Sequence, residues 1–339
     1  MASAYRVSVV VPNYNHARFL SARLDSILAQ TFSDFELIYL DDASTDDSAT
    51  VWARYEREAR VTHIVVNAQN SGSPFAQWNR GVLLARGEFV WIAEADDVAD
   101  VRFLERLVTV LDANPNVGVA YSQSNLIDDE GRIWGSAYAY NENMNDAAKR
   151  WQTNFVNAGK SEVANFLARH CTIPNASAVV FRRAVYNAVG GADVRYRLGG
   201  DHLLWTKMLL QSDVAFVAEP LNEFRRHTGT VRQTAYRDGT NLVEGYQIAA
   251  FIREQVSVPR AVWEAACDDL MDRWLEVVLL GHGAHVSRAR REEIIRLQKI
   301  VDAKPRRRFV RRFAQRTLKK FGGLLRTNKS RAVLPAETV

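Results

Sequence analysis

The sequence predicts an α/β protein built on a doubly wound, mostly parallel sheet with helices on both faces. Over the first 120 residues, short apolar runs alternate with segments of helical period. Each apolar run ends in polar residues. The chain of 339 residues is 47% hydrophobic and 24% charged, which is enough for a sizeable core. Parallel strands joined by helices bring their carboxyl ends to one edge of the sheet, where ligands bind in such proteins.

The expected elements follow in order. Val7 to Val11 is a β-branched run typical of a strand buried on both faces. In the segment 17–30, apolar residues recur at three- and four-residue steps, which predicts a helix. The same criteria predict strands at 35–40, 61–66, 88–93 and 117–122, a helix through Val51, Trp52 and Tyr55, and a helix at 74–85.

The second half of the chain is less regular and then becomes helical. Asn125 to Trp151 is polar and is expected to be an irregular loop. Helical patterns fill 242–256, 260–280 and 287–301. We therefore expect four parts: 1–120 and 121–238, the two halves of the sheet domain, then a helical extension at 239–303 and a basic tail at 304–339.

Charge is distributed unevenly along the chain. The formal net charge is +5, but 12 of the 44 Lys and Arg lie within 304–331, which holds no acid, and Glu337 is the only later charge. This leaves 32 basic and 38 acidic residues in 1–303, a net charge of about −6. Because positive charge is confined to one terminal segment, the pattern disfavours a nucleic-acid-binding surface.

The tail also has an apolar period, with Val310, Phe313, Leu318 and Phe321 among its Arg and Lys residues. This predicts a basic amphipathic helix on an anionic membrane surface. Two alternatives stay open: a disordered basic tail, and a helix docked on the acidic body. Two cysteines, no signal-peptide core and no run of about 18 apolar residues lead us to expect a cytoplasmic protein, peripheral at the inner face of the membrane.

The most informative segment is Glu94-Ala95-Asp96-Asp97, which closes the strand expected at 88–93. Clustered carboxylates at the carboxyl edge of a sheet supply hard oxygen ligands, and their mutual repulsion favours a cation between them. This arrangement suits a divalent ion that holds a diphosphate. The alternative for these residues in isolation is a solvated acidic loop.

Five ordered motifs over about 95 residues resemble family 2 glycosyltransferases. They are Val9-Val10-Val11-Pro12-Asn13-Tyr14-Asn15, Asp41-Asp42-Ala43-Ser44-Thr45-Asp46, Asn70-Ser71-Gly72, the glycines Gly81 and Gly87, and Glu94-Ala95-Asp96-Asp97. The resemblance implies a GT-A fold, a nucleotide-sugar donor with UDP-sugars favoured, Mg²⁺ or Mn²⁺, and transfer with inversion at the anomeric carbon. A glycan or lipid-linked glycan is the implied acceptor, in surface polysaccharide or lipopolysaccharide synthesis.

The resemblance also implies roles on the donor side. Asp42 would accept from a base N–H, with an Asx-turn or helix cap as the alternative. Pro12 and Tyr14 would form the wall beside the base, unless Tyr14 is a core aromatic. Asp96 would contact the ribose or the metal, and Asp97 would be the principal metal ligand.

Two departures from the family pattern concern the donor side. Glu94 stands where the family usually carries Asp, within the nucleotide-sugar site. The segment with Gln77 and Trp78 replaces the family's Ala-Arg-Asn, and Trp78 is expected to be a packed helix residue rather than a sugar platform.

Downstream motifs imply the remaining roles. Gly199-Gly200-Asp201 opens a helix, and Asp201 matches the family's general base, with a plain N-cap as the alternative. Pro220 to Thr230 resembles a motif in which Arg225 faces the diphosphate and His227 completes the metal shell.

Other classes of protein fit less well. A nucleotidyltransferase would normally show a Gly-rich basic phosphate loop after the first strand, where this chain has Pro12-Asn13-Tyr14-Asn15-His16. A dehydrogenase would show Gly-x-Gly-x-x-Gly at the same turn, and this is absent. A non-catalytic glycan-binding scaffold remains an alternative that the sequence opposes only through its intact Asp97 and Asp201.

Overall fold

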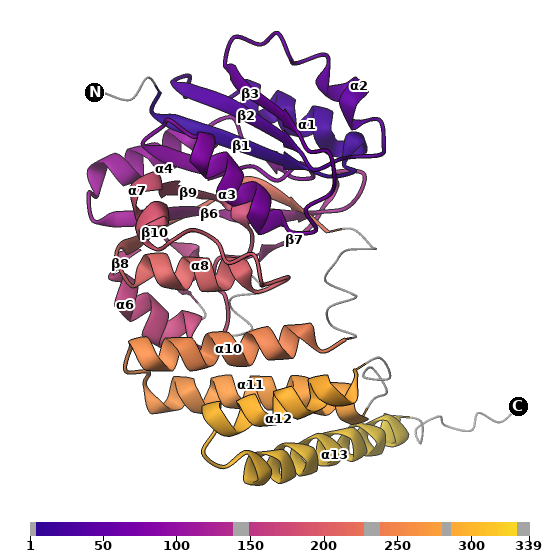
Figure 1. Cartoon of the computed structure of the whole chain (residues 1–339). Coiled ribbons are helices and arrows are strands. Elements are labelled where there is room, and N and C mark those ends of the chain that lie inside the picture. Colours follow the sequence, from indigo (N-terminus) through magenta and orange to yellow (C-terminus); the bar gives the residue numbers. More distant parts are fainter. Residues whose placement is uncertain (1–4, 138–148, 227–237, 280–285, 331–339) are drawn as a thin grey trace, which may run out of the picture.

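A computed structural model describes residues 5–137, 149–226, 238–279 and 286–330. A ten-stranded mixed sheet forms its centre, with the strand order β3-β2-β1-β4-β9-β6-β10-β5 (Figure 1). The strands of this path are β1 (Val7–Asn13), β2 (Phe35–Asp41), β3 (Val61–Val66), β4 (Phe89–Ile92), β5 (Val98–Ala99), β6 (Val117–Ile127), β9 (Val179–Arg182) and β10 (Asp213–Arg225). Beside this path, β7 (Ile133–Ser136) pairs with β6, and β8 (Phe155–Asn157) pairs with β10.

The first four large strands are parallel, as the sequence predicts. The register of β1 on β2 runs from Val7 opposite Phe35 to Asn13 opposite Asp41, and both strands are buried throughout. Alternate residues of β1 serve two cores, because Val10 packs on one face of the sheet and Val9 on the other. The doubly wound expectation is confirmed.

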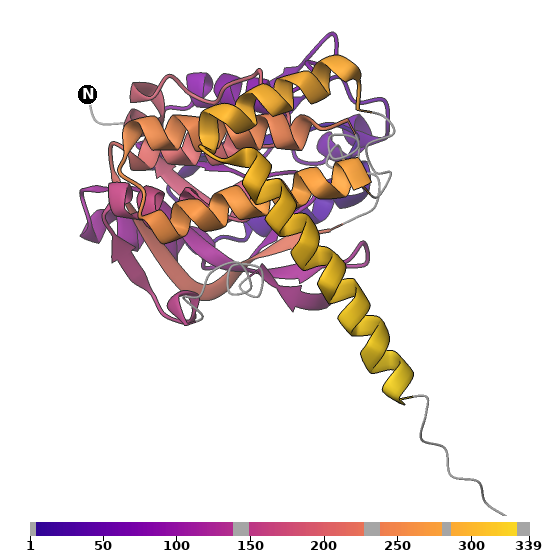
Figure 2. The same ribbon diagram turned by 90° about the horizontal axis from the view of Figure 1, so that it is seen from below.

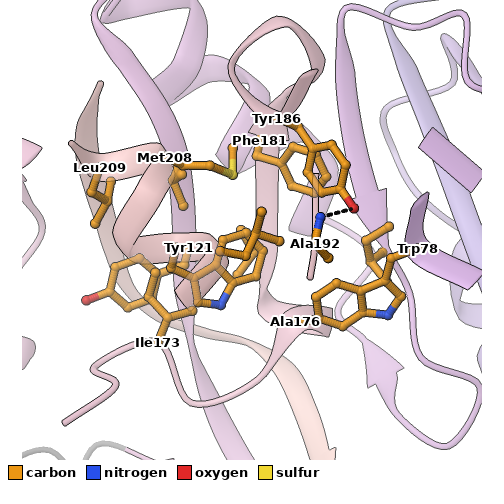
Figure 3. Packing of buried hydrophobic residues seen from close by; sticks show 14 of the residues in the cluster. Trp78, Tyr121, Ile173, Ala176, Phe181, Tyr186, Ala192, Met208 and Leu209 are labelled. Carbon is orange, nitrogen blue, oxygen red and sulfur yellow. Dashed lines mark hydrogen bonds between the residues drawn. The ribbon is translucent and has the colours of Figure 1, made fainter. Parts of the chain in front are cut away.

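Helices cover both faces. The core that includes Val9 takes up residues of α1 (Ala17–Leu28), α2 (Ser48–Trp52) and α4 (Phe103–Ala113). The core that includes Val10 takes up residues of α3 (Pro74–Leu84), α7 (Arg183–Ala188) and α8 (Gly200–Leu209). The short helix α6 (Gly159–Glu162) contacts α8. Figure 3 shows part of this second core, where the rings of Phe181 and Tyr186 stack at 5.2 Å.

Two features differ from the sequence-based expectation. Strand β9 lies antiparallel between β4 and β6, so it interrupts the parallel order in the middle of the sheet. The stretch expected as an irregular loop from Asn125 begins instead with the end of β6 and then β7, which form an antiparallel hairpin. Periodicity identifies a strand but not the strand beside it. The pairing of β6 with β7 depends on backbone hydrogen bonds, which a polar sequence does not reveal.

A helical extension follows the sheet domain and lies beside α8 in Figure 1. It consists of α10 (Thr240–Gln255), α11 (Arg260–Leu279), α12 (Arg288–Val301) and α13 (Pro305–Ser330). Leu242, Tyr246, Met271, Leu275 and Ile294 belong to its own apolar core. Within the described ranges, no helix has both the length and the apolarity that crossing a bilayer requires.

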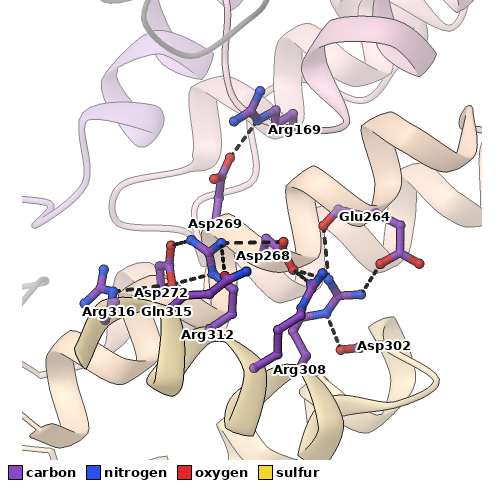
Figure 4. A network of polar contacts seen from close by, with 11 residues as sticks. Arg169, Glu264, Asp268, Asp269, Asp272, Asp302, Arg308, Arg312, Gln315 and Arg316 are labelled. Atoms are coloured by element: carbon purple, nitrogen blue, oxygen red, sulfur yellow. Dashed lines mark hydrogen bonds and ion pairs between the residues drawn. The ribbon is translucent and has the colours of Figure 1, made fainter. Parts of the chain in front are cut away.

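The tail helix α13 docks on α11 through arginines (Figures 2 and 4). Arg308 pairs with Glu264, Asp268 and Asp302, Arg312 with Asp272, and Arg316 with Glu276. The acids Glu264, Asp268, Asp272 and Glu276 recur every four residues along one face of α11. Of the three alternatives for the tail, the docked helix is therefore the one found as far as Arg316.

The docked face of α13 is mainly basic. Phe309 packs against the apolar core of the extension, but three other apolar residues of α13 are exposed. Val310 is 66% exposed, Phe313 43% and Leu318 72%. The tail thus presents Val310, Phe313 and Leu318 to solvent while several of its arginines are already paired with the body.

Candidate active site

In the carboxylate turn after β4, Asp97 is buried, and Glu94 and Asp96 are half-buried. Glu94 accepts a hydrogen bond from Nε1 of Trp78 at 2.8 Å, and Asp97 accepts one from the backbone N–H of Arg225 at 2.8 Å. Burial, with repulsion from Asp96, raises the pKa of Glu94 to about 8 and that of Asp97 to about 7. The structure thus concentrates acids that resist ionising together, unlike a solvated acidic loop.

Arg23 of α1 is the nearby buried cation. Its Nε donates to the carbonyl of Glu94 at 2.8 Å, and its guanidinium lies over the ring of Trp91 at 5.2 Å. Nη1 and Nη2 are buried and make no hydrogen bond within the described part of the chain. Burial lowers the pKa of Arg23, whereas the charges of Asp97, Asp96 and Glu94 raise it. Arg23 therefore offsets part of the negative charge of the turn.

Arg225 holds the turn in place from β10. Its Nε donates to the carbonyl of Asp96 at 2.8 Å, and Nη1 donates to the carbonyl of Asp128. The guanidinium also stacks on Phe19 at 4.4 Å. These contacts direct Arg225 to the main chain, and its predicted contact with a diphosphate stays a prediction.

A loop before β9 supports the turn from the other side. Oγ of Ser177 accepts from the N–H of Glu94 at 3.1 Å and also hydrogen-bonds Asp97, which lowers the pKa of that carboxyl against the effect of burial. Nε1 of Trp91 donates to the carbonyl of Ser177 at 2.8 Å. Residues from α1, β4, the segment before β9, and β10 thus converge on one short turn.

On the donor side, Asp42 is already fully engaged. Its carboxylate accepts from Nδ2 of Asn67 at 2.6 Å, Oγ of Ser71 at 2.7 Å and Nε2 of Gln77 at 2.8 Å. Asp42 thereby ties the loop after β3 and the start of α3 to the end of β2. Oε1 of Gln77 and Oδ1 of Asn13 are buried acceptors without a partner in the described ranges. Contact of Asp42 with a base stays a prediction.

Pro12 and Tyr14 lie at the end of β1. Pro12 is buried opposite Leu40, whereas Tyr14 is 45% exposed, so the alternative of a core aromatic is wrong for Tyr14. Asn15 and Ala43 adopt left-handed backbone angles, with φ of 58° and 62°. This conformation is uncommon outside glycine and marks both turns as tightly shaped.

Trp78 is a packed helix residue, as expected. It is 4% exposed and meets Phe75 edge to face at 5.1 Å. Its indole N–H bonds to Glu94, so its packing also orients the first carboxylate of the turn.

Asp201 lies in the first turn of α8, one residue after the first helical position. Gly199 is the N-cap and no side chain caps the helix, so Asp201 as a plain N-cap is wrong. Oδ1 of Asp201 accepts from the N–H of His202 at 2.7 Å. Asp201 also lines a cavity of about 210 Å³ together with His170, His202 and Arg273. Burial lowers the pKa of His170 to about 3 and of His202 to about 4, so both imidazoles are neutral at pH 7.

Of the three residues predicted to bind a metal, Asp96 and Asp97 lie within the described ranges. His227 lies outside them, and among the side chains that are described no three acids, histidines or cysteines gather into a metal site. Mg²⁺ commonly takes only one or two protein carboxylates, with waters and substrate phosphates completing its shell. Asp96 and Asp97 fit this type of site, because a cation bound between them would relieve their mutual repulsion.

Sequence reasoning missed Arg23 and Ser177. A signal for Arg23 was present, since a charged residue shares the buried face of α1 with Leu20, Leu24 and Ile27. The role of Ser177 depends on a strand pairing that no local pattern reveals.

The mostly parallel sheet with helices on both faces is a fold of the GT-A type, and comparisons with known proteins agree. The model of the family described as glycosyl transferase family 2 matches residues 8–190, more than half of the chain. The chain belongs to this family.

Relatives and solved structures extend the comparison. Glycosyltransferase GlyG of Streptococcus pneumoniae is 26% identical over 68% of this chain and 74% of its own length. An uncharacterised glycosyltransferase of Nostoc is 39% identical over 34% of this chain, and the match spans only 36% of that relative.

Two solved structures share the fold. Staphylococcus aureus TarS 1–349 in complex with UDP-GlcNAc has a TM-score of 0.57 at 18% identity, over 89% of this chain and 92% of the other. The mannosyltransferase PcManGT of Pyrobaculum calidifontis, in complex with GDP-Man and Mn²⁺, has a TM-score of 0.55 at 18% identity, over 88% and 86%.

Proposed function

We propose that this glycosyltransferase is a metal-dependent, inverting enzyme that transfers a sugar from a nucleotide-sugar donor to a hydroxyl of a glycan acceptor. The turn of Glu94, Asp96 and Asp97 carries this proposal, because acids held together against their mutual repulsion favour a bound cation. UDP-sugars are the favoured donors, and surface polysaccharide or lipopolysaccharide synthesis is the proposed setting.

The proposed mechanism uses residues of both halves of the sheet domain. Asp201 accepts the proton of the acceptor hydroxyl as its oxygen attacks the anomeric carbon from the face opposite the diphosphate. The bond from that carbon to the diphosphate oxygen breaks with its electron pair, which inverts the anomeric configuration. Asp96 and Asp97, with His227, would hold Mg²⁺ or Mn²⁺, which when bound supplies positive charge to the leaving diphosphate.

Binding of the donor is assigned to residues at the ends of β1, β2 and β4. Pro12 and Tyr14 would flank the base, and Asp42 would order the loops around it. The unpartnered acceptors on Asn13 and Gln77 are suited to the N–H groups of a base. Arg23 and Arg225 would hold the carboxylate turn in place through hydrogen bonds to its backbone carbonyls.

Thermal stabilisation across a panel of nucleotide sugars tests the proposal. A true donor must stabilise the native state by mass action, and the shift should require Mn²⁺. The active donor is then incubated with candidate acceptors, and NMR gives the anomeric configuration of the product. A nucleotidyltransferase would release pyrophosphate instead, and a non-catalytic scaffold would bind without turnover.

We also propose that the tail at 304–331 contacts an anionic membrane surface, which would place the enzyme at the inner face of the membrane. Support comes from the outward apolar residues Val310, Phe313 and Leu318, flanked by the exposed Arg306 and Arg307. Pairing of two α13 helices from different copies would bring like charges together, which favours a lipid partner.

A further inference from the structure

Glu244 of α10 holds the main chain that leads into α8. This residue is 5% exposed, and its carboxylate accepts three consecutive backbone N–H groups. Oε1 accepts from Arg197 at 2.6 Å, and Oε2 accepts from Leu198 at 2.9 Å and Gly199 at 2.7 Å. The helical extension is thereby hydrogen-bonded to the segment just before Asp201.

The chemistry of these contacts is unusual for a helix interior. Burying a carboxylate is costly unless hydrogen bonds compensate it, and three amide donors supply that compensation here. No salt bridge to Glu244 is found within the described residues. The carboxylate therefore acts as an anchor for three peptide planes, a geometry that an apolar residue of equal size could not maintain.

Those peptide planes end at the N-cap of α8, two residues before Asp201. The segment is also tightly confined. A Cβ added at Gly199 would lie 2.9 Å from Cδ1 of Ile248 on α10, and one added at Gly200 would lie 2.4 Å from the ring of Phe75 on α3. Since Asp201 follows directly, its backbone position depends on how this segment sits between α10 and α3.

The cavity beside Asp201 joins the same parts of the molecule. Its wall includes Gly199 and Asp201 of the sheet domain, and Glu244, Gly245 and Ile248 of α10. The helical extension thus borders the space next to the proposed base as well as holding the chain that carries it.

We propose that Glu244 is a positioning residue for Asp201, and that the helical extension is part of the catalytic apparatus through this contact. The inference rests on the proposed role of Asp201 as the base. It predicts that weakening the anchor lowers turnover without weakening donor binding, because the donor-side residues lie on other elements.

The test compares Glu244→Gln with Glu254→Gln, an exposed glutamate on the same helix, in the full chain. The amide keeps the size of the side chain but turns an N–H₂ toward backbone N–H donors. We expect Glu244→Gln to lower kcat by about 10- to 100-fold, because small displacements of a catalytic group cost rates of that order. The KM for the donor and the donor-induced thermal shift should stay within twofold, and Glu254→Gln should behave as the unmodified chain.

A double variant separates positioning from general damage. If Glu244 acts through Asp201, adding Glu244→Gln to Asp201→Asn should lower kcat by less than twofold further. A further drop of tenfold or more, or an unchanged kcat in Glu244→Gln alone, would overturn the inference. If Asp201→Asn itself keeps full turnover, the proposed base is wrong, which is a separate outcome.

A second variant keeps the inference testable if Glu244→Gln fails to fold. Gly200→Ala places a Cβ 2.4 Å from the buried ring of Phe75, which displaces the same segment and leaves the Glu244 charge in place. It should reproduce the loss of kcat with donor binding retained. Full activity of Gly200→Ala together with an unfolded Glu244→Gln, judged by circular dichroism, would mean that Glu244 serves stability alone.

Discussion

If the carboxylate turn binds a metal ion as proposed, the raised pKa values of Glu94 and Asp97 predict that this binding depends strongly on pH. A metal ion binds the ionised carboxylates, so protons held at pH 6 must leave before it can bind. With a pKa of about 8 for Glu94 and about 7 for Asp97, both groups are largely protonated at pH 6. At pH 8, Asp97 is largely ionised and Glu94 is about half ionised. The two groups repel each other, so they titrate as a pair.

The size of the effect follows from these values. If both protons leave, the apparent affinity for Mn²⁺ should rise on the order of 10²- to 10³-fold between pH 6 and pH 8. Carboxyl groups with an ordinary pKa near 4 would be ionised throughout, and the affinity would hardly change. Glu94→Gln removes one titrating group and the repulsion it exerts on Asp97, so the remaining rise should be about tenfold or less.

Electron paramagnetic resonance of free Mn²⁺ measures this affinity directly on the full chain. The unmodified protein and Glu94→Gln are titrated at pH 6, 7 and 8 at constant ionic strength. An affinity of the unmodified protein that stays constant within twofold across this range would refute the reasoning. It would mean that the acids are ionised at pH 6 or take no part in binding.

The same pKa shifts predict how stability without metal depends on pH. A raised folded pKa means that the native state keeps protons which the unfolded chain releases. The stabilising contribution is complete below the unfolded pKa near 4.5 and is lost as pH rises through the folded values. Without metal, the melting temperature should therefore decline from pH 5 to pH 8 by more in the unmodified protein than in Glu94→Gln.

Four further outcomes are expected. Asp97→Ala should abolish transfer and metal-dependent nucleotide binding while the circular dichroism spectrum is retained, and transfer by the unmodified enzyme in excess EDTA would contradict this. Asp201→Asn should lower kcat by about 10² or more with donor affinity little changed, because its interaction is made mainly in the transition state. Arg308→Met leaves the buried Asp302 without its ion-pair partner, so urea denaturation should show a loss of about 3–5 kcal/mol, against little change for the exposed Arg307→Met. Truncation before Lys304 should release the protein from anionic liposomes at low salt, and equal binding of both forms would remove the tail as a membrane element.

The local sequence pattern determined the position of many helices and strands of this protein. The strand at 61–66 has the predicted bounds, and the helices of the extension begin and end within two residues of prediction. β-branched runs and helical spacing report burial on a face, which is a property of the segment itself. The acids after β4 and the aspartate at the start of α8 were also visible, because strand ends and helix starts fix where side chains gather.

Tertiary structure decided the contacts that give those residues their chemistry. Arg23 lies 71 residues from Glu94, and Glu244 lies 45 residues from Gly199, so only packing brings each pair together. The position of the basic tail was likewise decided by packing. Its sequence allowed three outcomes, and the choice was made by acids spaced every four residues on α11, whose match to the arginines of α13 exists only when the two helices lie side by side. Burial then raised the pKa of the strand-end acids, because desolvation depends on the whole surrounding fold rather than on neighbours in sequence.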